Sequence, residues 1–405
     1  METVIANIAN ALPGTTGYIY PNEFELHWGL LVVIYPYLTG LVAGAFILAS
    51  LERVFKVHEI TPVYRLSLVS ALAFLVIAPL PLLAHLGHPE RSFEMFLTPN
   101  TSSAMAMFGF VYAWYLMGVL LLELWLDYRR DIVKWSNEKT GLLKYFYKFS
   151  TLGATDVSPK ALEFDEKASR FITILGVPSA FLLHGYVGFI FGSIKANPWW
   201  SSVLMPIVFL FSAIVSGIAL MILIYMIATM FRWKKMDMAC LNKLASFLLY
   251  AMLIDFTLEA LDFIHRLYES EESITILSDM ISNRLFISLI IAQIILGSVA
   301  PLVGIILAKL GKVPDEMKRM LYFIAAVLVQ VGIFSTRWNV VVGGQLFSKS
   351  LRGLTVYKLE LFGMEGLFMA VTLLVAPVVV LYILVKLFPP WMDKPELENV
   401  AKEVG

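Results

Sequence analysis

Cysteine and charge are both scarce in this chain, and each shortage excludes a class of protein. The only cysteine among the 405 residues is Cys240, so a disulfide within the chain and an iron–sulfur cluster held by its cysteines alone are excluded. Charged residues make up 15%, where a soluble domain has about 25%. Acidic and basic residues balance at 31 each, so net charge indicates no partner, nucleic acid included.

Long apolar runs take the place of the missing charge. Hydrophobic residues make up 59% of the chain, and many lie in runs of about 20 or more, the length that a helix needs to cross hydrocarbon. We therefore predict an all-α polytopic membrane protein with nine or ten spans: two four-helix bundles plus at least one extra transmembrane helix. The nine predicted spans are 26–50, 66–86, 103–126, 171–192, 203–231, 244–266, 285–308, 320–336 and 365–388.

Basic residues predict the orientation of these spans. With the N-terminus outside, the inside segments carry 23 of the 31 lysines and arginines, which favours N-out and C-in. The first residues have no basic start and no long apolar core, so we expect no cleaved signal peptide. The predicted parts are an outside segment 1–25, one transmembrane domain 26–388 with a charged inside loop 127–170, and a cytoplasmic tail 389–405. Segment 337–364 is too polar for a confident span, although it could re-enter the protein interior.

Two short segments of small residues resemble each other. They are Thr39–Gly44 in the first span and Ser212–Gly217 in the fifth. Four helices separate their starts and both run from outside to inside, which fits two four-helix bundles followed by one extra helix. Alternatively, each is only a stripe of small residues that lets two helices approach closely. Both interpretations stay open on the sequence.

Ionisable side chains in hydrocarbon are costly, so those within the predicted spans are functional candidates. Asp255, Glu259, Asp262 and Arg266 lie on one face of the sixth span, with Asp255 near its middle. Carboxyl groups about one turn apart can pass protons through intervening waters, and we interpret the three acids as a proton path. The alternative is a charged ladder that Arg266 and His265 tie together for packing.

Histidine is too sparse and too scattered for haem. A b-type haem needs two facing imidazoles at matched depth. Only His184 lies well within a predicted span, while His27 and His85 lie at the outer ends of spans one and two. We expect no haem and no metal on this chain. For His184, the alternative to a functional role is that it only makes a satisfied polar contact inside the bundle. Among the intramembrane candidates only Glu123 lies close to the inner surface, so the polar groups gather toward the outside.

Three segments carry a family resemblance. They are YPYLTGLVAGAF in the first span, PLPLLAHLGHPERSFEMFLTPNTSSAM at 79–105 and GVPSAFLLHGYVGFIFGSIKANPWWSSVLMPIVFLFSAIVSGIAL at 176–220. Together they resemble the NrfD/PsrC family, the membrane subunits of polysulfide reductase-like complexes. The chain length is more similar to the longer branch of that family, with HybB and DsrP, and RWNVVVGGQ (Arg337 to Gln345) favours DsrP.

The resemblance implies a quinone site. Subunits of this family bind menaquinone or ubiquinone near the outer face, hold no haem or metal, and exchange electrons with an iron–sulfur (ferredoxin-like) subunit docked outside. In the polysulfide reductase relative, the tyrosine of a Tyr-x-Gly motif contacts the quinone, and it matches Tyr186 here. The other candidates for the pocket are His184, His85, His27 and Arg91. That relative also uses an asparagine and a histidine of its first span, and the spacing of His27 does not match them cleanly.

The DsrP branch implies a larger assembly. Its expected partners are a multihaem cytochrome c, a haem b membrane subunit and a heterodisulfide-reductase-like cytoplasmic subunit, in the cytoplasmic membrane of a prokaryote with dissimilatory sulfur (sulfite) metabolism. The chain would be the quinone-site subunit of an oxidoreductase rather than a stand-alone enzyme. Two alternatives remain. One is a secondary transporter built on the repeat, although such a transporter would use several acids near the midplane and Asp255 is the only one there. The other is a purely structural membrane anchor for redox subunits.

Overall fold

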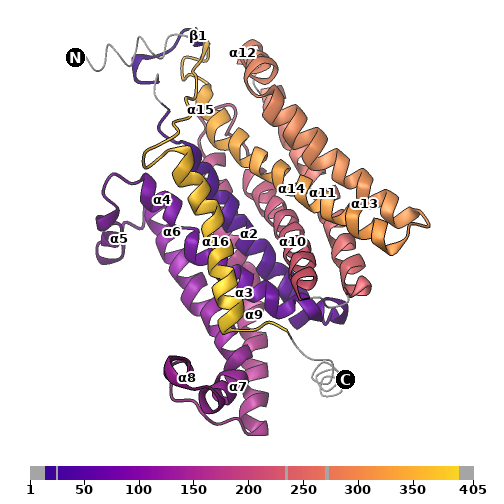
Figure 1. Ribbon diagram of the computed structural model, residues 1–405. Helices are drawn as coiled ribbons and strands as arrows, with labels where there is room; N and C mark the ends of the chain where they lie inside the picture. Colours follow the sequence, from indigo (N-terminus) through magenta and orange to yellow (C-terminus); the bar gives the residue numbers. More distant parts are fainter. Residues whose placement is uncertain (1–13, 24–25, 233–235, 270–272, 392–405) are drawn as a thin grey trace.

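A computed structural model describes residues 14–23, 26–232, 236–269 and 273–391. Within these ranges nine helical segments are long and apolar enough to cross a membrane, which confirms the predicted all-α class (Figure 1). They are built from α2 (Leu30–Arg53), α3 (Thr61–Ile77) with α4 (Leu80–His85), α6 (Ala104–Ala113) with η4 (Trp114–Leu121) and α7 (Leu122–Glu138), α9 (Pro159–Gly192), α10 (Met205–Phe231), α11 (Met238–Glu269), η7 (Phe286–Val299) with α13 (Ala300–Leu310), α14 (Asp315–Trp338) with η8 (Asn339–Gly343) and α15 (Gly344–Leu346), and α16 (Leu367–Leu387).

Helix α2 is the centre of the molecule. Of its most apolar stretch 89% is buried, against 22% for α16 at the periphery. Helix α2 packs against α3, α9 and α10, while α10 packs against α11 and α14, and α14 against η7 and α13. These contacts divide the spans into a first bundle from α2 to α9 and a second bundle from α10 to α15. Helix α16 packs on α3 as the extra helix, as the sequence predicts.

The two small-residue motifs cross each other at the interface between the bundles. A Cβ atom on Gly44 would lie 2.1 Å from the carbonyl oxygen of Ala213, and one on Gly217 would lie 2.3 Å from the carbonyl carbon of Gly44. Only glycine therefore permits this approach of α2 and α10. The packing role predicted for the motifs is confirmed, and the motifs also occupy equivalent places in the two bundles.

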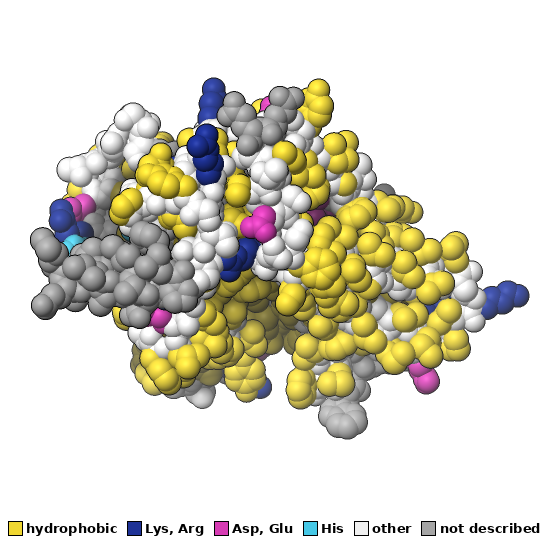
Figure 2. Space-filling view, turned by 90° about the horizontal axis from the view of Figure 1, so that it is seen from above, with side chains coloured by type: hydrophobic (Ala, Val, Ile, Leu, Met, Phe, Trp, Pro, Cys, Tyr) yellow, Lys and Arg dark blue, Asp and Glu magenta, His cyan; other side chains and the backbone are white. Residues whose placement is uncertain are grey.

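The two ends of the bundle are named here by the ends of α2. At the Leu30 side lie α12 (Ile274–Asp279) and the short antiparallel pair of β1 (Thr16–Gly17) with β2 (Gly353–Leu354), and at the Arg53 side lies α8 (Gly141–Ser150) (Figure 1). Seen from the Leu30 side, hydrophobic side chains cover the flanks and charged ones are few (Figure 2). Such a surface suits contact with lipid tails.

Two segments differ from the sequence prediction. The loop predicted at 127–170 is largely helical, because α7 continues to Glu138, α8 follows, and α9 begins at Pro159. Arg129 of α7 and Asp165 of α9 form an ion pair at 2.6 Å that holds these extensions together. The eighth span does not end at residue 336 but continues through η8 and α15 to Leu346, buried in the protein. The polar side chains there find partners inside the bundle, so the segment need not leave it.

Candidate functional site

A buried histidine and a buried arginine lie between the two bundles. His184 of α9 and Arg337 of α14 are both fully buried, with Nε2 of the imidazole 3.1 Å from Nη2 of the guanidinium. Arginine can only donate, so Nε2 accepts, and Nδ1 carries the proton of the neutral ring. Nδ1 lies 3.2 Å from the hydroxyl of Thr39, which is thus placed to accept. The lack of a side chain at Gly40 leaves room for the imidazole, because a Cβ there would lie 3.1 Å from Cε1 of His184.

Arg337 is only partly paired in its buried position: its Nη2 has partners, whereas its Nε and Nη1 have no hydrogen-bond partner. It donates to the hydroxyl of Ser212 at 2.6 Å, and its guanidinium lies 4.1 Å from the centre of the Phe209 ring. It also interacts electrostatically with Asp255 and Glu259 of α11. A buried charge needs such partners to offset the loss of water. Arg337 thus lies within electrostatic range of two of the three acids, without a direct ion pair to either.

The three acids of α11 face the interior, as their spacing predicts, but they are held differently. One oxygen of Asp255 has no hydrogen-bond partner. Glu259 accepts hydrogen bonds from Gln293 at 3.2 Å and Thr336 at 3.3 Å. Asp262 forms an ion pair with Arg266 at 2.5 Å and a hydrogen bond with Ser202. The charged-ladder interpretation thus describes Asp262, while Asp255 and Glu259 have no ion-pair partner within direct contact.

A cavity of about 190 Å³ lies beside these acids. Its polar lining comes from Glu259, Asp262, Arg266, Gln293, Thr336 and Asn339. Gln293 and Asn339 are joined by a hydrogen bond of 2.8 Å, and both lie in π-helical segments, η7 and η8. The widened turns of π-helical segments often occur at functional sites. The cavity is large enough for a few water molecules between the carboxyl groups.

Tyr186 lies on another face of α9 from His184, among aromatic side chains of the first bundle. Its ring stacks on Phe108 at 5.8 Å, and Tyr35 packs edge-on against the same phenylalanine at 5.3 Å. Tyr112 donates to the carbonyl of Leu75, whereas the buried hydroxyls of Tyr35 and Tyr186 have no hydrogen-bond partner. Two buried and unpaired hydroxyls on rings that pack against the same phenylalanine suit a ligand with polar oxygens.

The remaining candidates lie at the Leu30 side. Nδ1 of His85, the last residue of α4, lies 2.8 Å from Glu365 just before α16. Arg91 is exposed and forms an ion pair with Glu94 at 2.9 Å. His27 is exposed just before α2. The structure does not bring these three residues to Tyr186 by any direct contact that it describes. In the same described ranges no group of three or more histidine, cysteine, aspartate or glutamate side chains is placed to hold a metal ion.

Several residues of these clusters are not among the site residues predicted from the sequence, and they include Arg337, Thr39, Ser212 and Tyr35. The predicted eighth span ends at residue 336, so it leaves Arg337 just outside. The signal that indicates otherwise is the apolar run Val340–Gly344, which extends the eighth span beyond Arg337. The sequence lacks a comparable signal for Thr39 and Ser212, apart from their matching positions as first residues of the two small-residue motifs.

Comparison with known proteins agrees with this architecture. The chain is 32% identical over 322 residues to the C subunit of selenate reductase from Mesobacillus selenatarsenatis, covering 78% of this chain and 73% of that protein. It is 27% identical over 221 residues to the putative membrane C subunit of dimethyl sulfoxide reductase from Halobacterium salinarum, covering 54% and 48%. It is 23% identical over 351 residues to an Hdr-like menaquinol oxidoreductase integral membrane subunit of Archaeoglobus fulgidus, covering 85% and 77%.

The family profile described as polysulphide reductase, NrfD, matches residues 21–349, which includes eight of the nine spans, Tyr186, the acids of α11 and Arg337. The resemblance seen in the sequence is thereby confirmed at the level of the family, while the narrower likeness to the DsrP branch stays a prediction. The chain belongs to the NrfD family of polysulphide reductase-type membrane subunits.

Proposed function

We propose that this chain is the quinone-reactive subunit of a respiratory oxidoreductase complex. It exchanges electrons between a menaquinone-type quinol and an iron–sulfur subunit docked at the Leu30 side, which we take as the outer face. The observation that carries the proposal is the pair of buried, unpaired hydroxyls of Tyr35 and Tyr186 beside Phe108. Membership of the NrfD family and the menaquinol named for the Archaeoglobus fulgidus relative support the choice of ligand.

The chemistry of these residues fits a quinone. A quinone oxygen accepts hydrogen bonds, and the corresponding hydroquinone hydroxyl can also donate. A tyrosine hydroxyl both donates and accepts, so it suits either form and brings no charge into the membrane. An aromatic wall such as Phe108 suits a flat ring. In its quinol form the bound ligand would supply two electrons and two protons per turnover, and in its quinone form it would take them up.

The protein's own residues then hold the ligand and move protons. Tyr186 and Tyr35 orient the headgroup through their hydroxyls. The neutral His184 and the guanidinium of Arg337 provide a polar connection from α9 to the acids of α11. Glu259 and Asp255 take up or release protons through water in the 190 Å³ cavity, which Glu259 and Asp262 help to line. Tyr186 is six residues before the end of α9 at Gly192, or about 9 Å along a helix. This places it close to a partner docked at the Leu30 side.

The assembly around the chain is also a proposal. We propose an iron–sulfur subunit at the Leu30 side, with a multihaem cytochrome c, a haem b membrane subunit and a heterodisulfide-reductase-like cytoplasmic subunit as in the DsrP branch. The complex would lie in the cytoplasmic membrane of a prokaryote. Lipid would surround the apolar flanks (Figure 2). The transporter and the structural anchor remain the competing functions, and the experiment below separates both from the redox function.

The test compares Tyr186→Phe with Tyr250→Phe in the purified complex. The first change removes one of the unpaired hydroxyls, whereas Tyr250 is 63% exposed on the flank of α11. A lost hydrogen bond of about 0.5–1.5 kcal/mol corresponds to a factor of about 2–13 in affinity. We expect normal assembly of both variants, and weaker quinone binding with slower quinol turnover only in Tyr186→Phe.

Two results would contradict the proposal. One is unchanged quinone binding and turnover in Tyr186→Phe, together with a photoreactive quinone analogue that crosslinks only at the Arg53 side. The other is a wild-type complex that retains all its redox subunits but has no quinol turnover at all, as a purely structural anchor would. Substrate flux into vesicles without redox partners would identify a transporter.

A further inference from the structure

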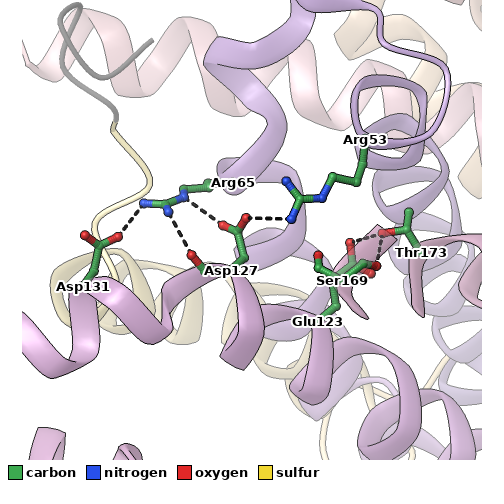
Figure 3. Close-up of polar contacts among 7 residues, drawn as sticks. All are labelled: Arg53, Arg65, Glu123, Asp127, Asp131, Ser169 and Thr173. Carbon is green, nitrogen blue, oxygen red and sulfur yellow. Dashed lines mark hydrogen bonds and ion pairs between the residues drawn. The ribbon is translucent and has the colours of Figure 1, made fainter. Parts of the chain in front are cut away.

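Another buried carboxyl group lies at the opposite end of the bundle from Tyr186 and the acids of α11. Glu123 of α7 is fully buried near the Arg53 side of the bundle. Its Oε1 accepts a hydrogen bond from Thr173 of α9 at 2.8 Å, and its Oε2 has no partner (Figure 3). A buried carboxyl oxygen without a partner is costly unless it binds a proton or a water molecule. The proposed quinone function makes no use of this group.

Other unpaired polar groups surround Glu123. The hydroxyls of Tyr64, Tyr115 and Ser169 are all buried without a hydrogen-bond partner. The guanidinium of Arg53 lies 5.8 Å from the centre of the Tyr64 ring, and Ser169 lies beside Glu123 in Figure 3. Internal water molecules bind where several polar groups converge in this way. The arrangement therefore suits a water-linked carboxyl group rather than a packed structural one.

A chain of ion pairs leads from Arg53, which lies near Glu123 in Figure 3, to the surface at the Arg53 side. Arg53, which interacts electrostatically with Glu123, lies 3.9 Å from Asp127. Asp127 forms an ion pair with Arg65 at 2.8 Å, and Arg65 forms another with Asp131 at 2.8 Å (Figure 3). The side chain of Asp131 is 24% exposed, so the chain of charges ends in solvent.

Beyond Tyr115 the packing is apolar. The ring of Tyr115 packs edge-on against Phe46 at 5.6 Å. Gly176 lies so close to Phe46 that a Cβ there would be 2.2 Å from its ring. The polar connection of Glu123 thus runs toward the Arg53 side.

We propose that Glu123 is a proton-binding site that exchanges protons with the solvent at the Arg53 side through the cluster of Arg53, Asp127, Arg65 and Asp131. Uptake forms an O–H bond at the carboxylate of Glu123 and takes the proton from a water chain that starts at the surface. Release reverses this step, and no oxidant or reductant takes part. The inference goes beyond the proposed function, because the site lies at the other end of the bundle from Tyr186 and binds its proton without a quinone.

The first test uses dicyclohexylcarbodiimide, an apolar reagent that adds to protonated carboxyl groups. The purified complex is treated without quinone, and the modified residues are located by mass spectrometry. Asp165 is the matched control, because it is also buried near the Arg53 side but forms an ion pair with Arg129 at 2.6 Å. We expect label on Glu123 and none on Asp165. Glu123→Asp keeps a carboxyl group and should keep label at position 123, whereas Glu123→Gln should lose it.

A second test follows the route. The infrared band of the protonated carboxyl group, assigned by its loss in Glu123→Gln, should shift on transfer to D₂O. We expect this exchange to slow in Asp127→Asn and to keep its rate in Glu163→Gln, which changes an exposed acid of α9 that pairs only with Lys167. Absence of label on Glu123 in the wild type, or equal label on Asp165, would overturn the proposal even if variants fail to assemble. Neither readout involves quinone, so a failed quinone function would leave this result standing.

Discussion

Nε2 of His184 and Nη2 of Arg337 lie 3.1 Å apart, and each residue is also bonded to the first residue of one small-residue motif. His184 lies 3.2 Å from Thr39 in α2, and Arg337 lies 2.6 Å from Ser212 in α10. Helix α9, the fourth span, thus contacts α2, the first span, in the same way that α14, the eighth span, contacts α10, the fifth. This correspondence, together with the crossing of the motifs, favours the internal repeat over a chance likeness.

The first prediction concerns Arg337. Replacement by methionine removes the donor to His184 and Ser212 and leaves Asp255 and Glu259 without their buried positive neighbour. Two lost hydrogen bonds of about 0.5–1.5 kcal/mol each predict a clear decrease in stability. Thermal unfolding in detergent should show a lower midpoint for Arg337→Met than for Arg337→Lys, which keeps the charge. Equal midpoints for Arg337→Met and the wild type would contradict the structural role.

The second prediction concerns the crossing of α2 and α10. Gly44→Ala and Gly217→Ala each place a methyl group against backbone atoms of the other helix. Overpacking of this kind costs about 1–3 kcal/mol. We expect reduced assembly of the complex, measured by the yield after size-exclusion chromatography. Gly304→Ala in α13 is the control, because nothing lies within 4 Å of a Cβ at that position. Normal yields for all three variants would show that the helices can separate without loss.

The third prediction separates the two interpretations of the α11 acids. Glu259→Gln keeps the shape and the polar contacts with Gln293 and Thr336 but removes the titrating group. We expect slower quinol turnover with an unchanged unfolding midpoint. Asp262→Asn instead breaks the buried ion pair with Arg266, so its main effect should be a loss of stability of up to about 3–5 kcal/mol. Normal turnover in Glu259→Gln would favour a packing role for both acids.

The fourth prediction is the orientation. The excess of lysine and arginine predicts that the Arg53 side faces the cytoplasm. A green fluorescent protein fused after Gly405 should fluoresce, because it folds to its fluorescent form in the cytoplasm. The same reporter inserted after Gly363, in the exposed segment before α16 at the Leu30 side, should not. If only the second fusion fluoresces, the orientation is the opposite of the predicted one, and the proposed quinone site lies near the cytoplasm.

The sequence by itself determined the helical class and the nine spans. A membrane leaves the backbone few ways to satisfy its hydrogen bonds, so long apolar runs must be helices. Periodicity also placed Asp255, Glu259 and Asp262 on one inward face of α11, and it placed Tyr186 and His184 on different faces of α9. Each of these inferences depends only on residues within one helix.

Only the tertiary structure decided which side chains meet. His184 and Arg337 are 153 residues apart, and Glu123 and Thr173 are 50 apart, so no local pattern pairs them. The tertiary structure also tied Asp262 to Ser202 and packed the rings of Tyr35 and Tyr186 against the same Phe108. The physical reason is that a buried polar group in a membrane protein must find its partner on a neighbouring helix. Which helices are neighbours depends on close approaches such as Gly44 against Gly217, and these are settled by packing in three dimensions.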